Sequence, residues 1–145
     1  MEITIKAFDE LSTDELYALL RLRAEIFVVE QTCPYQDLDG KDQGALHVCL
    51  YDGSRLVAYL RVLARGVRYP EVCISRVVTA EHGRGWGRLL MQAGMRAAVE
   101  RFGADAIRIS AQCQAIPFYQ KQGFAVVSGE YLEDDIPHVE MLWRA

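Results

Sequence analysis

The sequence lacks any long apolar run. Its apolar segments are the length of a strand and fall far short of the roughly 20 residues that a membrane-spanning helix needs. The first residues, Met1 to Lys6, show neither the apolar stretch nor the small-residue cleavage site of a secretory signal. We therefore expect a protein without a membrane partner, located in the cytoplasm.

Cysteine pairs and an excess of basic residues are also missing. The four cysteines, Cys33, Cys49, Cys73 and Cys113, are widely spaced without a C-x-x-C pair, which disfavours a zinc site or a disulfide framework. We expect no bound metal. The net charge of −4 disfavours a general nucleic-acid-binding surface, because phosphate contacts need clustered lysines and arginines.

What is present fits one domain spanning residues 1–145. Apolar residues make up 51% of the chain, enough for an ordinary globular core, and there is no repeat, low-complexity stretch or linker. Apolar and β-branched patterns predict strands at 2–8, 46–51, 55–63, 72–79, 106–111, 124–128 and 138–144. Asp52-Gly53 indicates a hairpin between the second and third of these strands.

Helical patterns lie between the strands. Ser12 and Glu15 form a capping box that starts a helix reaching about Gln31. Its expected buried stripe consists of Leu16, Leu20, Ala24 and Phe27. Further helices are expected from Gly87 to Phe102, with Gly103 as the C-cap, and over 115–122, and the polar segment 32–44 is expected to be a loop with a short helical turn. This order predicts a single α/β domain with a mixed, mostly antiparallel sheet and about four flanking helices.

The most informative segment runs from Arg76 to Met91. A β-branched strand enters a loop with three alternating glycines, Gly83, Gly85 and Gly87, and a helix follows at once. Glycines allow a tight turn and close backbone approach, and a helix N-terminus offers unpaired N–H donors to an anion. Arg84 and Arg88 add positive charge, so the loop suits a phosphate or pyrophosphate.

The spacing narrows the choice of ligand. G-x-G-x-G is not the G-x-G-x-x-G of a dinucleotide-binding unit, and no Gly-Lys-Ser/Thr of a P-loop is present. Taken alone, the glycine loop is also compatible with a turn that binds no ligand.

A second segment, Gln112 to Phe124, ends a strand and continues through a short helix containing Phe118-Tyr119 to Gly123-Phe124. It resembles the second signature of the GNAT acetyltransferase superfamily, and the glycine loop resembles the acetyl-CoA pyrophosphate motif of that superfamily. Two signatures in the right order are more specific than either alone. The segments 22–42 and 129–141 extend the resemblance to the ElaA-like branch, so that it spans nearly the whole chain.

Two positions depart from the superfamily pattern. His82 occupies a position usually held by Arg or Gln, and Gln112 one where many relatives have Asn. Neither change removes the backbone donors of the glycine loop.

The resemblance implies a GNAT acyl-CoA N-acyltransferase fold whose sheet splays between the fourth and fifth strands, where acetyl-CoA enters as co-substrate. The residues implied to bind it are Val77, Val78, Thr79, His82, Gly83, Arg84, Gly85, Trp86, Gly87, Arg88, Gln112 and Phe118. Tyr119 matches the tyrosine that protonates or hydrogen-bonds the departing thiolate, with core packing as its alternative role.

The residues that handle the acceptor are left open. Glu30, Asp135, His138 and Glu140 are candidates for the base that deprotonates the amine, beside a water chain. Arg76 is either an ion-pair partner or an acceptor-site group. Three acidic residues in the loop over 32–44 either attract a cationic acceptor or only solvate the loop: Asp37, Asp39 and Asp42.

The predicted activity is transfer of an acetyl group from acetyl-CoA to a primary amine by direct attack in a ternary complex. The acceptor is a small-molecule or peptide amine, and a homodimer is left open because the sequence does not determine oligomeric state. The competing class is a non-catalytic CoA-binding or sensing module on the same fold.

Overall fold

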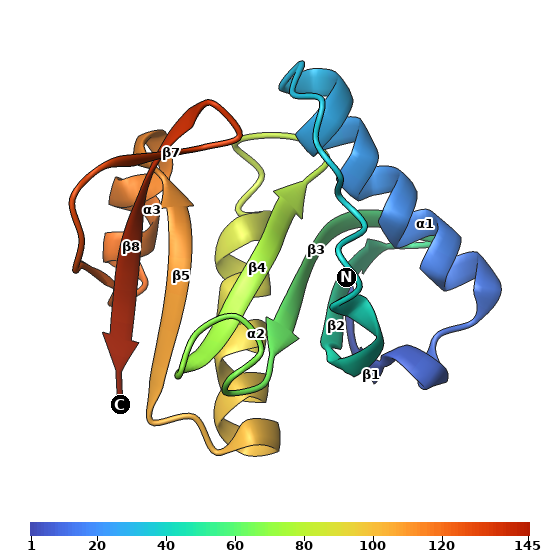
Figure 1. The fold of residues 1–145 in the computed structure, drawn as a ribbon. Helices are drawn as coiled ribbons and strands as arrows, with labels where there is room; N and C mark the ends of the chain where they lie inside the picture. The colour runs from blue at the N-terminus through green and yellow to red at the C-terminus, as the bar shows by residue number, and fades with distance from the viewer.

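A mixed eight-stranded sheet runs through the computed structural model, which describes residues 1–145 (Figure 1). Its central path has the order β1-β2-β3-β4-β5-β8-β6, and β7 pairs with β8 beside this path. The strands are β1 (Glu2–Ala7), β2 (Leu46–Asp52), β3 (Arg55–Leu63), β4 (Val72–Thr79), β5 (Ala106–Gln112), β6 (Ala125–Val126), β7 (Tyr131–Glu133) and β8 (Ile136–Arg144). The seven strands predicted from the sequence are all present, and β7 is additional.

Every strand pair is antiparallel except β4 and β5, which are parallel as expected. The β4–β5 pairing is short. It holds only Val72 to Ile107 and Cys73 to Arg108, so the β4 edge from Ile74 to Thr79 has no strand partner in β5. The predicted splay between the fourth and fifth strands is therefore present, and Figure 1 shows the two strands parting.

Three α-helices accompany the sheet: α1 (Thr13–Arg23), α2 (Trp86–Phe102) and α3 (Ile116–Lys121). The fourth helical element expected, a turn within 32–44, is a 3-10 segment at Asp42–Gly44, and two further 3-10 segments lie at Phe8–Glu10 and Cys113–Ala115. The helix predicted to end near Gln31 does so, but its last part, Ala24–Glu30, is π-helical. No helix is long and apolar enough to cross a membrane.

The main core lies between the sheet and α2, on the face that Figure 1 shows behind the strands. Gly94 allows this close packing, because a Cβ there would lie 2.7 Å from Cδ2 of Leu60. On the other face α1 packs on β3 and β4, where Leu19 and Leu22 contact Cys49, Tyr59 and Val78. The two helices thus cover opposite faces of the sheet and leave the gap between β4 and β5 open.

The buried stripe of α1 differs from the predicted one. Leu19, Leu22 and Arg23 are buried, whereas Ala24 of the predicted set is exposed. Leu16, Leu20 and Phe27 of the predicted set are partly buried and pack on the same cluster, and Arg23 is buried because carboxylates pair with it. Apolar periodicity alone cannot detect a buried arginine.

Those carboxylates come from the acidic loop. Asp42 accepts hydrogen bonds from Arg23 at 2.7 Å and from Arg61 at 3.0 Å, and both arginines are at most 1% exposed. Asp37 pairs with Arg23, and Asp39 pairs with Arg61 at 2.6 Å. All three are held in ion pairs that fasten the loop to α1 and to the sheet, a structural role that neither of the two roles considered describes.

The strand absent from the prediction, β7, forms a hairpin with β8. Glu133 pairs with Ile136 across a two-residue turn, and Asp134 and Asp135 both have positive φ, at 51° and 61°. Two positive φ values are typical of a type I′ turn, which normally contains Asn or Gly. A three-residue strand with an Asp-Asp turn carries little of the usual sequence signal for a hairpin.

Candidate active site

The gap in the sheet begins at an irregularity in β4. Two β4 residues, Arg76 and Val77, lie opposite one residue of β3, because the register passes from Arg61–Ser75 directly to Tyr59–Val78. Arg76 has a φ of 57°, a conformation that costs a non-glycine residue about 1–3 kcal/mol. A bulge bends its strand and increases the local twist, and here it accompanies the divergence of β4 from β5.

Ion pairs hold Arg76 in this conformation. Its Nε lies 2.8 Å from Oδ1 of Asp37, and its Nη2 donates to the Asp37 carbonyl oxygen at 3.0 Å. The guanidinium also lies over the ring of Tyr35. Of the two roles left open for Arg76, the ion-pair role is the one present, although the residue also borders the cleft described below.

A groove lies over the glycine loop and the start of α2. Gly83 and Gly85 have positive φ, at 71° and 75°, and Gly85 is the N-cap of α2. The first turn of α2 contains no acidic residue, so its N–H groups face no negative charge of their own helix. Backbone donors and a helix N-terminus at one place suit an anionic ligand.

The structure brings nearly all predicted CoA-binding residues to this glycine-loop groove. Its lining consists of Val77, Val78, Thr79, Glu81, His82, Gly83, Arg84, Gly85, Trp86, Gly87, Arg88, Ala115, Phe118 and Tyr119. Gln112 is the exception, since it borders only the neighbouring cleft.

Two aromatic residues of the groove, Trp86 and Phe118, also pack against the rest of the protein. Trp86 is only 4% exposed and belongs to the main core, with Arg84 over its ring at 5.1 Å. Phe118 packs against Gly87, where an added Cβ would lie 3.3 Å from the end of the ring. Glycine at position 87 therefore keeps α3 close to the start of α2, and only Gly83 and Gly85 are required by their φ.

A second hollow, the central cleft, occupies the gap between β4 and β5 and has a volume of about 270 Å³. It shares Val77, Val78, Thr79, His82, Ala115 and Tyr119 with the glycine-loop groove. Its other walls include Phe27 of the π-helical segment and Gln31, which follows that segment. Ser110 and Gln112 of β5 and the β7–β8 hairpin complete them. A bound molecule could therefore reach from the glycine loop into a polar chamber.

Tyr119 stands where the two hollows meet. Its ring packs edge-on against Phe118 and Phe124. Burial raises the pKa of the Tyr119 hydroxyl to about 12, so this group is a neutral hydrogen-bond donor at physiological pH. The predicted placement beside Phe118 is present, and the role of the hydroxyl in chemistry stays a proposal.

The four candidate bases lie in different surroundings. Glu30 is about half exposed and faces His82 at 3.6 Å, outside the central cleft. Glu140 accepts from Arg108 at 2.9 Å and does not border the cleft either. Asp135 lies in the hairpin turn, beside a separate shallow hollow. Only His138 borders the central cleft.

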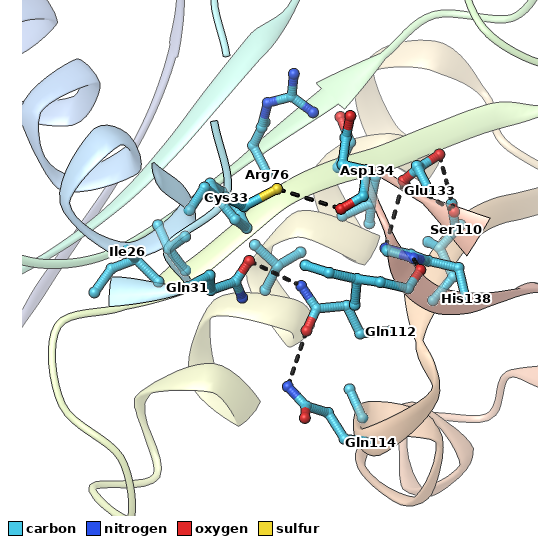
Figure 2. A pocket seen from close by; sticks show the side chains of 18 of the residues that line it. Ile26, Gln31, Cys33, Arg76, Ser110, Gln112, Gln114, Glu133, Asp134 and His138 are labelled. Carbon is cyan, nitrogen blue, oxygen red and sulfur yellow. Dashed lines mark hydrogen bonds and ion pairs between the residues drawn. The ribbon is translucent and has the colours of Figure 1, made fainter. Parts of the chain in front are cut away.

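Sequence reasoning missed the polar cluster around His138, which Figure 2 shows at the β7–β8 end of the cleft. Glu133 of β7 lies 3.4 Å from Nε2 of His138 and accepts from Arg68 at 2.6 Å. Ser110 of β5 hydrogen-bonds the hydroxyl of Tyr131 at 2.5 Å. These residues come from four separate segments, so no local motif joins them. The alternation of β5 and β8, which puts Ser110 and His138 on the face opposite α2, was the one available signal.

A gap in a mixed sheet beside a glycine loop at a helix N-terminus is the arrangement that the GNAT resemblance predicts. The chain matches the acetyltransferase (GNAT) domain family over residues 12–145, and it belongs to this family. It is 40% identical to the protein ElaA of Escherichia coli over 136 residues, which cover 91% of this chain and 89% of ElaA.

Two solved structures of similar sequence have the same fold as this chain. The crystal structure of E. coli ElaA has a TM-score of 0.92 with this chain, at 37% identity and 99% coverage of both chains. An acyl-CoA N-acyltransferase from Pseudomonas aeruginosa has a TM-score of 0.92 at 41% identity, also with 99% of both chains covered. The ElaA-like GNAT resemblance and the predicted fold are confirmed. No group of three or more His, Cys, Asp or Glu side chains is placed to hold a metal ion.

Proposed function

We propose that this protein is an N-acetyltransferase that moves an acetyl group from acetyl-CoA to a primary amine by direct attack in a ternary complex. One observation carries the proposal: the unpaired edge of β4 leads from the glycine-loop groove into a polar cleft that is large enough for a small amine or the end of a peptide. Membership of the GNAT family and the similar acyl-CoA N-acyltransferase support acyl transfer as the reaction class.

The donor lies along this path. The pyrophosphate of CoA binds over residues His82 to Arg88, where the αL glycines and the first turn of α2 direct N–H groups outward. Arg84 and Arg88 supply positive charge there. The pantetheine arm lies along Val77, Val78 and Thr79. It forms hydrogen bonds with the free backbone edge of β4, in the place that a longer β5 pairing would occupy.

This placement supports the chemistry in two ways. Binding both substrates side by side replaces a bimolecular encounter, and well-oriented reactions of this kind reach effective molarities of about 10⁵–10⁸ M. An unpaired β4 N–H aimed at the thioester oxygen stabilises the oxyanion that forms when the amine attacks. No covalent acyl-enzyme is required.

Tyr119 acts on the leaving thiolate. Full proton transfer from a phenol of pKa about 12 to a thiolate, whose conjugate acid has a pKa of about 8.5, is unfavourable. We therefore assign Tyr119 the donation of a hydrogen bond to the sulfur as negative charge develops, and the proton that completes the thiol comes from the attacking nitrogen or from water.

Two measurements on the same protein distinguish the proposed enzyme from the alternative, a CoA-binding module without turnover. Release of free thiol from acetyl-CoA is followed with polyamines, aminoglycosides, amino acids and peptide N-termini, and thermal stabilisation by CoA is measured on the same protein. We expect stabilisation by CoA together with amine-dependent thiol release for at least one of these classes. Stabilisation without turnover for any amine would favour the binding module.

A further inference from the structure

A hydrogen bond, a stacked ring and a carboxylate hold the imidazole of His138. Nδ1 lies 2.6 Å from the carbonyl oxygen of Ile136, and the ring stacks on Tyr131 at 6.1 Å with an interplanar angle of 23°. Gln112 of β5 lies opposite in the strand register, and His138 is 6% exposed. The ring therefore has one orientation, with Nε2 toward Glu133 and the central cleft (Figure 2).

The hydrogen bond to Ile136 determines the tautomer. A carbonyl oxygen only accepts, so Nδ1 of His138 carries a proton and is the donor. In the neutral ring Nε2 then holds a lone pair. The carboxylate of Glu133, 3.4 Å from Nε2, also only accepts, so a proton that Nε2 takes from an ammonium group in the bordering cleft gains a partner there.

The charged groups nearest the ring are Glu133 and Arg68. The carboxylate of Glu133, 3.4 Å from Nε2, accepts from the N–H that forms there and so stabilises the imidazolium. Arg68 pairs with the other oxygen of Glu133 at 2.6 Å and partly offsets its charge. The hydroxyls of Tyr131 and Ser110, the amide of Gln112 and, in the adjoining turn, Asp134 lie near the ring. The other titratable and charged groups that line the cleft are Cys33, Tyr35, Arg76, His82 and Tyr119.

We propose that His138 is the base that deprotonates the acceptor amine, and that Glu133 is the residue that positions and stabilises its protonated form. This inference rests on the proposed acetyl transfer. The N–H bond of the bound ammonium breaks, its proton forms a bond with Nε2, and the electron pair left on nitrogen attacks the thioester carbon. As the C–S bond breaks, sulfur takes its electron pair. The second nitrogen proton is lost in this collapse and balances the thiol, and His138 returns its proton to solvent.

A matched set of variants tests the role by its dependence on pH. His138→Asn keeps an N–H near the position of Nδ1, for Ile136, but has no group in place of Nε2. Asp135→Asn removes a nearby carboxylate that lies outside the central cleft and tolerates the same positive φ. We expect His138→Asn to lower kcat/KM about 10²–10⁴-fold at neutral pH, the usual contribution of a general base. Asp135→Asn should keep the parent rate.

The dependence of kcat/KM on pH distinguishes a catalytic role of His138 from a purely structural one. In His138→Asn, kcat/KM should rise in proportion to the fraction of neutral free amine, so that the loss shrinks as the pH approaches the amine pKa of about 10. Glu133→Gln should lower kcat at neutral pH with CoA affinity unchanged. A deficit that is the same at every pH, or no deficit, would overturn the assignment of His138.

Imidazole ¹⁵N NMR tests the same inference without turnover. In the protein saturated with CoA, we expect the neutral imidazole of His138 to carry its proton on Nδ1 and none on Nε2. A ring protonated on Nε2 and bare on Nδ1 would contradict the proposal. A protein that shows the expected tautomer but acetylates no amine would instead contradict the proposed function.

Discussion

The hydroxyl of Tyr119 gives the most specific expectation at the scale of single residues. Tyr119→Phe removes one donor and keeps the ring that packs on Phe118 and Phe124. A hydrogen bond to a charged group contributes about 1.5–3 kcal/mol, equivalent to about 10–10²-fold in rate. We expect kcat and kcat/KM to fall together by this factor while CoA affinity is retained. A parent rate under conditions where chemistry limits would make Tyr119 a packing residue only.

Gly85 gives a second expectation at this scale, with a control in the same helix. Gly85 and Gly103 flank α2, both have positive φ, at 75° and 62°, and neither would meet an atom within 4 Å of an added Cβ. Valine at either position strains the backbone, but only position 85 lines the glycine-loop groove. Calorimetric titration should show CoA binding weakened more than about tenfold, or about 1.4 kcal/mol, in Gly85→Val and unchanged in Gly103→Val. Equal affinities in the two variants would contradict the groove assignment.

At the scale of elements, the turn of the β7–β8 hairpin gives an expectation for the free energy of unfolding. Its turn places Asp135 at a φ of 61°, which aspartate tolerates better than alanine. Asp135→Ala should lower the free energy of unfolding by about 1 kcal/mol, whereas Asp135→Gly should leave it equal or higher. Urea denaturation measures both. The same loss in both variants would show that the aspartate side chain matters here, and not the backbone conformation.

Elements with strong local signals were predictable, and those that depend on distant partners were not. The capping box of Ser12 and Glu15 and the C-cap at Gly103 are present as predicted, because these contacts lie within a few residues. The predicted buried face of α1 was right for Leu16, Leu20 and Phe27, but it missed Arg23, which is held by Asp37, fourteen residues away. Likewise the glycine loop could be located from its spacing, whereas His138, Glu133 and Arg68 meet only through the sheet topology.

The buried ion-pair network affects the whole molecule. Burial alone would raise the pKa of Asp42, but hydrogen bonds and charge from Arg23 and Arg61 lower it below its ordinary value, and the pKa of Asp39 is lowered in the same way by Arg61. A lowered folded-state pKa contributes stability that is fully present above the unfolded value of about 3.9 and is lost as the pH falls through the folded value. This contribution to the free energy of unfolding should therefore be constant from pH 7 to about 5 and decline below about 4.

Removing one member of the network tests it directly. Asp42→Asn leaves two buried arginines short of a charge partner, and breaking such a pair costs about 3–5 kcal/mol. Asp105→Asn is the control, because Asp105 pairs with Arg65 at an exposed site. Chemical denaturation at pH 7 should show the large loss only for Asp42→Asn, with a shallower acid decline than in the parent. Similar stabilities for the two variants would contradict the structural role given to the acidic loop.

The measurement that bears most directly on the account follows the acetyl group itself. The protein is incubated with acetyl-CoA and an amine, and the masses of amine, CoA and protein are read together over one turnover. Direct transfer in a ternary complex predicts acetylated amine and free CoA in equal amounts, with no acetyl group on the protein at any time. CoA binding without acetylated amine, or an acetyl group passing through the protein, would contradict it.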